Sequence, residues 1–393
     1  MPKPITQGIE LKYGFPLFTQ NASTAFLVSG EKLRVSDIWG LWHYIIKRYK
    51  KCYPSTNYTF LLSLVEQSQY FYIAAATAPL KYQPLLYYYS FLNIAKVFIT
   101  LRDPSLETSG LEYNHGIDSC TIDKNSKLRS AYVQLKSLID STGNKQKISV
   151  AYTLSRELGD NIEQSIPPVP GISMGPWKFN IKSLFQACIG IHRTVSESFK
   201  ENEHFSRLQG STLWKTGRKL NFQGELYISE KVRNNLISAG YDIEFDNESN
   251  TSKVNFKYTA TSSKIKKQDY LSHAQIINDL GIWHYNTNDE NRMYISPMAF
   301  SIKPGVSEYT LNPRTGADDN IRLSSATIIY YIMFFLGSIT RYHPYMFESI
   351  LSDKDIWMIG EFLKTQPYQY MNILLSKLLS TPILGSRMPL QYE

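Results

Sequence analysis

The stretch "LLYYYSFLNIAK", residues 85–96, decides the fold because it predicts a helix that is apolar on nearly every face. Such a helix must be buried among other helices, which makes a mainly helical chain the expectation. At about 100° per residue, Tyr89, Asn93, Lys96 and Thr100 fall on one narrow side of it. We call these four residues the polar stripe. A buried ammonium must meet a carboxylate, carbonyl groups or a ligand anion, or reach water at its tip.

Two explanations of the polar stripe stay open. Buried polar residues commonly form hydrogen-bond networks between elements, so a structural network is the default interpretation. It would join Tyr89, Asn93 and Lys96 to His115 in the following loop. The alternative is a ligand site at the same place.

The remaining chain predicts an α+β fold that is helical at both ends and rich in β-strands in the middle. Prolines and polar turns separate the periodic segments. We predict helices over 36–51, 58–78, 84–102, 126–141, 181–200, 324–341, 353–364 and 367–380, with a loop over 103–125. Short alternating runs between Gly, Asn and Asp turns predict strands and hairpins. The predicted divisions are an arm (1–34), a helical domain (35–205), a β-rich middle (206–323) and C-terminal helices packing on the helical domain (324–393).

The charge balance favours contact with an anionic partner. The net charge is +8 and the pI is near 9.0, which suits DNA, RNA, an acidic protein or an anionic surface and separates none of them. Lysines and arginines interleaved with tyrosine or tryptophan combine charge with stacking surface. A solvated surface is the default for any one cluster. The candidate nucleic-acid residues are Lys47, Arg48, Lys50, Lys51, Lys215, Arg218, Lys219, Lys264, Lys266 and Lys267.

The three cysteines, Cys52, Cys120 and Cys188, lie far apart and form no CxxC motif, so neither a disulfide framework nor a cysteine-built zinc site is expected. The apolar run at 326–339 is short for a bilayer. We expect a cytoplasmic protein without membrane contact, metal or cofactor. The sequence has no Walker A loop, GxSxG, HExxH or dinucleotide fingerprint, so an enzymatic activity stays undecided.

A histidine and a pair of basic residues offer acid–base chemistry near the stripe. His115 precedes Gly116, which permits a tight turn, and Arg341 and His343 end the helix over 324–341. A guanidinium that holds phosphate and an imidazole that moves a proton can cleave RNA. The HEPN ribonucleases use a longer spacing between Arg and His than Arg341 and His343 have, which weighs against their active site. Loop and helix-end hydrogen bonding is the structural alternative for each residue.

Three motifs together resemble the YaaC-like family of bacterial proteins. They are "PLLYYYSFLNIAK" at 84–96, "NHG" at 114–116 and "FFLGSITRYHPYMF" at 334–347. The resemblance implies a helical architecture in which residues 84–102 and 325–343 pack together, and it implies no established mechanism. It also suggests the convergence of Tyr89, Asn93, Lys96, His115, Arg341 and His343.

Three functions follow as hypotheses. The leading one is an accessory subunit of a bacterial assembly, antiviral defence being one setting, that contacts a partner protein and, through the basic clusters, DNA or RNA. The second is a metal-independent ribonuclease or phosphate-ligand enzyme that uses Lys96, His115, Arg341 and His343. The third is a sensor of small anions at the same place. The oligomeric state is left open.

Overall fold

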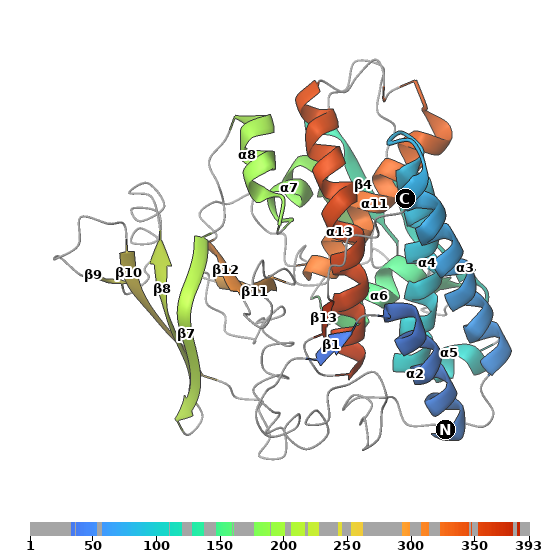
Figure 1. Cartoon of the computed structure of the whole chain (residues 1–393), viewed down its shortest axis with the longest axis horizontal. Helices are drawn as coiled ribbons and strands as arrows, with labels where there is room; N and C mark the ends of the chain where they lie inside the picture. The colour runs from blue at the N-terminus through green and yellow to red at the C-terminus, as the bar shows by residue number, and fades with distance from the viewer. Residues whose placement is uncertain are drawn as a thin grey trace, which may run out of the picture.

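The structure is a computed structural model of the 393-residue chain (Figure 1). For the strands between residues 206 and 313 it describes the backbone. The described residues are 33–35, 37–52, 57–109, 111–119, 128–136, 147–158, 160, 177–188, 190–200, 206–216, 219–227, 243–245, 253–261, 293–298, 308–313, 323–345, 347, 353–379 and 383–385.

Long helices form the core, and the residues of the opening motif lie at its centre. The predicted helices over 36–51, 58–78, 84–102 and 324–341 are confirmed. They are α2 (Ile38–Cys52), α3 (Tyr58–Thr77), α4 (Gln83–Arg102) and α11 (Ser325–Tyr342). Helix α4 contacts α3, α11, α13 (Asp353–Leu379) and the short α6 (Val150–Leu158), which explains why it is apolar almost all round (Figure 1).

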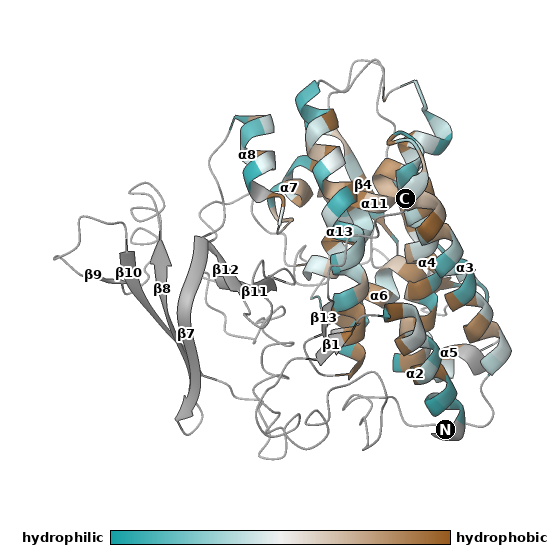
Figure 2. Ribbon diagram, in the orientation of Figure 1, coloured by the Kyte–Doolittle hydropathy of each residue, from teal (hydrophilic) through white to brown (hydrophobic). Residues whose placement is uncertain are grey.

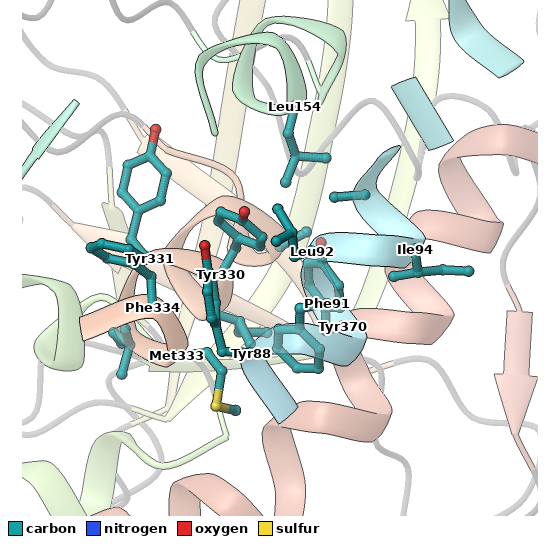
Figure 3. Close-up of a cluster of buried hydrophobic side chains, with 14 of the residues drawn as sticks. Tyr88, Phe91, Leu92, Ile94, Leu154, Tyr330, Tyr331, Met333, Phe334 and Tyr370 are labelled. Carbon is teal, nitrogen blue, oxygen red and sulfur yellow. The ribbon is translucent and has the colours of Figure 1, made fainter. Parts of the chain in front are cut away.

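Aromatic side chains fill the space between α4, α11 and α13. The rings of Phe91 and Tyr370 stack with centroids 4.0 Å apart, and the Tyr88 ring meets Phe334 edge-on at 5.3 Å (Figure 3). All residues of α11 from Ala326 to Thr340 are buried. The outer helices α2 and α13 instead carry both hydrophobic and hydrophilic positions, as helices with one buried face do (Figure 2).

A glycine lets α11 approach α4 closely. A Cβ atom on Gly337 would lie 3.1 Å from Tyr88 Cβ and 3.4 Å from the Pro84 carbonyl oxygen. Nearby, Thr340 Oγ1 donates to the Lys81 carbonyl at 3.0 Å. Later residues of α11 meet earlier residues of α4, so the two helices run antiparallel. The packing of residues 84–102 against 325–343, which the family resemblance implied, is confirmed.

The start of α11 is fixed by a buried carboxyl group. Ser324 caps the helix and accepts from the Thr327 backbone N–H at 3.3 Å, while its own N–H donates to Asp160 at 2.6 Å. Burial raises the pKa of Asp160 to about 7, and hydrogen bonds from Thr327 and Ser324 oppose that rise. Asp160, just after α6, therefore ties that helix to α11.

Small sheets follow α4, where the sequence predicted a loop over 103–125 and a helix over 126–141. Both predictions were wrong. The elements are α5 (Ser105–Thr108), β2 (Tyr113–Asn114), β3 (Ile117–Ser119), the 3-10 turn η1 (Leu128–Ser130), β4 (Tyr132–Leu135), β5 (Ile148–Ser149) and β6 (Trp177–Asn180). Strand β2 pairs with β5 in parallel, and β4 lies between β3 and β6 in antiparallel pairing. Because β4 alternates between buried and half-buried residues, its pairing overrides the helical pattern.

The strand runs predicted in the middle of the chain are confirmed, and with two further strands, Ser206–Thr216 and Glu308–Pro313, they form a six-stranded antiparallel sheet. Its order is β11-β12-β7-β8-β10-β9. The strands are β7 (Ser206–Thr216), β8 (Lys219–Tyr227), β9 (Ile243–Phe245), β10 (Lys253–Thr261), β11 (Met293–Met298) and β12 (Glu308–Pro313). The chain is thus α+β with helical N- and C-terminal parts. The predicted domain boundaries stay predictions.

Two further helix predictions needed correction. The helix over 181–200 is divided into α7 (Ile181–Gln186) and α8 (His192–Phe199), because Gly190 between them adopts a φ of +95°. The two predicted helices at the C-terminus form the single helix α13, which continues through Pro367. Buried residues continue along α13 on both sides of the proline, and that packing offsets its lost hydrogen bond.

A short parallel pair joins the chain ends that the structure describes. Strand β1 (Leu33–Val35) pairs with β13 (Ile383–Gly385). Most of the predicted N-terminal arm lies outside the described residues. Within the described part, no helix combines the length and apolar character that crossing a membrane requires.

Candidate functional site: a cation cluster on helix α4

The polar stripe of α4 faces α3 and the strand β2. Asn93 donates to the Gln67 side-chain oxygen on α3 at 3.3 Å. Thr100 donates to the Lys96 carbonyl at 2.8 Å, and its hydroxyl lies 2.6 Å from the Tyr113 hydroxyl. These bonds satisfy Asn93 and Thr100 within the protein, and none of them runs to His115. They leave the Lys96 ammonium itself to be explained.

His115 is held against α4 by the turn between β2 and β3. Gly116 adopts a φ of +66°, and a side chain there would overlap Ser149 on β5. The Gly116 N–H donates to Asn114 Oδ1 at 3.0 Å, and the His115 carbonyl accepts from the Ala151 N–H at 3.1 Å. Glycine is therefore required for the backbone to pass this close, and the imidazole is positioned by strand pairing on both sides.

The His115 imidazole is oriented by a buried tyrosine. Its Nδ1 is hydrogen-bonded to the Tyr88 hydroxyl on α4, and the two ring centroids are 5.7 Å apart. Burial raises the pKa of Tyr88 far above its usual value, so this phenol stays protonated. When Tyr88 donates to Nδ1, the neutral imidazole keeps its hydrogen on Nε2. That nitrogen has no hydrogen-bond partner among the described residues and can donate to a ligand.

Two cations flank this histidine without a carboxylate of their own. Lys96 is half buried, its Nζ lies 6.0 Å from the centroid of the Tyr113 ring, and burial lowers its pKa. Arg341, at the exposed end of α11, donates from Nη1 to the Tyr89 hydroxyl at 3.1 Å. Within the described part of the chain, neither cation forms an ion pair.

Lys96 and Arg341 both disfavour the charged form of His115. Burial lowers its pKa most, and the charges of Lys96 and Arg341 lower it further. The opposing carboxylate, Asp118, is exposed and already paired with Lys136. We call Lys96, His115 and Arg341 the cation cluster. It offers one ammonium, one guanidinium and one neutral imidazole from three different elements, which is an arrangement for holding an anion.

The structure does not bring His343 into the cation cluster. His343 follows the last turn of α11, where its N–H donates to the Ile339 carbonyl at 2.8 Å, and its ring meets Tyr345 edge-on with centroids 6.1 Å apart. Of the four catalytic candidates, Lys96 and Arg341 are thus close enough to His115 to lower its pKa. Among the described residues, no group of His, Cys, Asp and Glu could hold a metal ion.

The basic cluster on α2 is described in part, and the other two lie largely outside the described residues. On α2, Lys47 and Lys50 are exposed, Lys50 Nζ lies 4.5 Å from the Tyr58 ring centroid, and Arg48 contacts Tyr44. Lys51 belongs to α2, Lys215 to β7 and Lys219 to β8, but their side chains lie outside the described part. Arg218, Lys264, Lys266 and Lys267 lie outside it altogether.

A comparison with protein families identifies the family of this chain. The family model described as YaaC-like Protein matches residues 17–378. The chain belongs to the YaaC-like family. No curated protein and no solved structure matches it. The match includes all three YaaC-like motifs quoted above, and the cation cluster lies where these motifs meet: Lys96 in the first, His115 in the second and Arg341 in the third.

Sequence reasoning missed two tyrosines that shape this YaaC-like site. Tyr88 lies beside the polar stripe, but a helical wheel places it with the apolar residues, and its bond to His115 spans 27 residues. Tyr113 carries the ring beside Lys96 and precedes His115 by two residues. The adjacency of Tyr113 to the "NHG" motif was the one available signal.

The first prediction separates a ligand site from a structural network at Lys96. Replacing Lys96 with methionine keeps an unbranched side chain of similar length and removes the charge. We expect the free energy of unfolding to change by less than about 0.5 kcal/mol, because relief of the desolvation cost offsets the lost ring contact. Urea denaturation measures it, with Lys364→Met as a control on an exposed lysine of α13. A loss of about 1–3 kcal/mol, as for a buried hydrogen-bond partner, would make Lys96 structural.

Proposed function

We propose that this YaaC-like protein binds a phosphate-bearing ligand at the cation cluster. One observation carries the proposal: half-buried Lys96 has no carboxylate partner in the described part of the chain and lies close enough to His115 to lower its pKa. Holding the Lys96 ammonium partly out of water is unfavourable unless an anion compensates it.

The three donors suit phosphate in particular. A guanidinium matches phosphate oxygens in a fork, and an ammonium acts as a compact point charge. A neutral imidazole N–H adds a third donor without adding charge. Because Lys96, His115 and Arg341 come from α4, the β2–β3 turn and α11, a ligand needs acceptor oxygens on more than one phosphate to engage all three.

Binding is better supported than turnover. Cleavage of a phosphodiester by acid–base catalysis needs a second proton-transferring group besides His115. His343 is not among the contacts of the cluster, and Tyr88 holds its proton because burial raises its pKa far above the usual value. The ribonuclease hypothesis therefore ranks below a binding or sensing role.

The test of binding is thermal stabilisation of the full chain by pyrophosphate. We expect Tm to rise by about 2 °C or more when pyrophosphate reaches about 100 times Kd, because the ligand binds the folded state. Lys96→Met and Arg341→Met should abolish the rise, and Lys364→Met should keep it. Sodium chloride at equal ionic strength controls for general salt effects. An equal rise in wild type and Lys96→Met would place binding elsewhere.

A second candidate function is that of an accessory subunit in a bacterial assembly, such as one for antiviral defence. The supporting observation is a largely apolar surface at the end of α3, where Lys81 Nζ lies 5.3 Å from the Tyr82 ring centroid. Tyr70 is 74% exposed, Ile73 is 41% exposed, and Ala74 and Thr77 continue the same face. Tyr82, just after the helix, is 49% exposed. We call Tyr70, Ile73, Ala74, Thr77 and Tyr82 the α3 patch. Exposed aromatic and apolar groups gathered in this way favour a protein partner, and the widely spaced cysteines favour the cytoplasm.

The α3 patch predicts that the native protein is part of a larger particle. Light scattering of the tagged chain purified from its own cells should give a mass above the 45.2 kDa of one chain. Tyr70→Glu should return the mass to one chain, because a carboxylate cannot be buried unpaired in an interface. Trp357→Glu, on the exposed side of α13, is the matched control. A wild-type mass of one chain would contradict the subunit role.

A further inference from the structure

We infer that the phosphate-bearing ligand is a single-stranded nucleic acid lying along the seam between α3 and α4. This inference rests on the proposed function and names the ligand class. Its basis is a repeated unit, a cation beside two aromatic rings, that occurs twice along the seam.

The first unit lies at the start of α4. Arg341 donates to the Tyr89 hydroxyl, and the Tyr89 ring meets Phe71 on α3 with centroids 5.4 Å apart. Both rings are half buried and keep exposed surface. A guanidinium and two ring surfaces therefore lie together at one end of the seam.

The second unit lies farther along α4. Lys96 Nζ is 6.0 Å from the Tyr113 ring centroid, and Tyr113 stacks on Phe60 of α3 with centroids 6.5 Å apart and an angle of 20° between the rings. Phe60 is 36% exposed, so part of its ring is open to water. Here an ammonium replaces the guanidinium beside a second pair of rings.

The two units are in register because α3 and α4 run antiparallel. Phe71 meets Tyr89, and Gln67 meets Asn93 through a hydrogen bond, so lower residue numbers on α3 face higher ones on α4. Tyr89 and Lys96 are seven residues apart, or about 10 Å along the helix. His115 is bonded to Tyr88, and its pKa is lowered by the cations of both units, Arg341 and Lys96.

This spacing favours a chain of phosphates over a single one. A lone phosphate is smaller than the distance along α4 between the units, whereas successive nucleotides offer a phosphate and a flat base at each step. Proteins bind single strands in this way, with cations along the backbone and aromatic side chains against the bases. A duplex keeps its bases stacked inside and leaves the rings without a partner. The chemistry therefore identifies a single strand.

The experiment measures anisotropy of fluorescein-labelled single-stranded oligothymidylate and oligouridylate against the full chain at low salt. We expect both to bind, and unlabelled pyrophosphate to displace them. Phe60→Leu and Phe71→Leu should each weaken binding by about fivefold or more, because each removes a stacking surface. Trp357→Leu is the matched control for loss of an exposed ring. Binding of one oligonucleotide alone shows which of the two strands, DNA or RNA, the seam accepts and keeps the single-strand assignment.

Each contrary result has a distinct meaning. If pyrophosphate stabilises wild type but not Lys96→Met, while neither oligonucleotide binds, the nucleic-acid inference fails and the proposed function stands. Equal affinity for a duplex, or unchanged affinity in Phe60→Leu and Phe71→Leu, would also contradict binding of a single strand along the seam. If neither pyrophosphate nor an oligonucleotide binds, both proposals fail. Melting curves of the two leucine variants check folding, and pyrophosphate stabilisation of Phe60→Leu shows that its cation cluster is intact.

Discussion

The close packing of α4 against α11 is the constraint on which the rest of the structure depends. Gly337 has no side chain to separate the helices, so the Tyr88 Cβ and the Pro84 carbonyl lie within about a van der Waals contact of it. This approach places the end of α11, with Arg341, beside Tyr89. A larger residue at this position would move the helix and the guanidinium together.

Because α4 is buried, the partner that each of its few polar groups contacts indicates the role of that group. A fully apolar helix in this position would need no hydrogen-bond partners, whereas each buried polar group requires one. Asn93 and Thr100 find theirs within the protein, and the stripe is to that extent a structural network. Lys96 finds an aromatic ring but no carboxylate in the described part of the chain. The same stripe thus supports the fold with its neutral members, and we propose that its charged member holds an anion.

The sequence pattern predicted those helices that depend on interactions between residues close together in the chain. Apolar periodicity and flanking prolines predicted α2, α3, α4 and α11 because such helices follow from neighbouring residues. The helix expected over 126–141 was wrong because β4 is held by β6, whose residues lie more than 40 positions away. In the site, Lys96 could be named from the sequence as a cation in an apolar helix, and His115 as a histidine beside the turn glycine Gly116. The bonds of Tyr88 to His115 and of Arg341 to Tyr89 could not, since only packing brings them together.

The most direct test of the account is the pKa of His115, measured by NMR with His115→Gln identifying the signal. Because burial, Lys96 and Arg341 all disfavour the imidazolium, the pKa in the free protein should lie below the usual 6.5. A bound anion offsets the two cations, so saturating pyrophosphate should raise the pKa; by linkage, protonation of His115 then favours binding as the pH falls. A free-protein pKa at or above 6.5, or one that pyrophosphate leaves unchanged, would contradict an anion site built on the cation cluster.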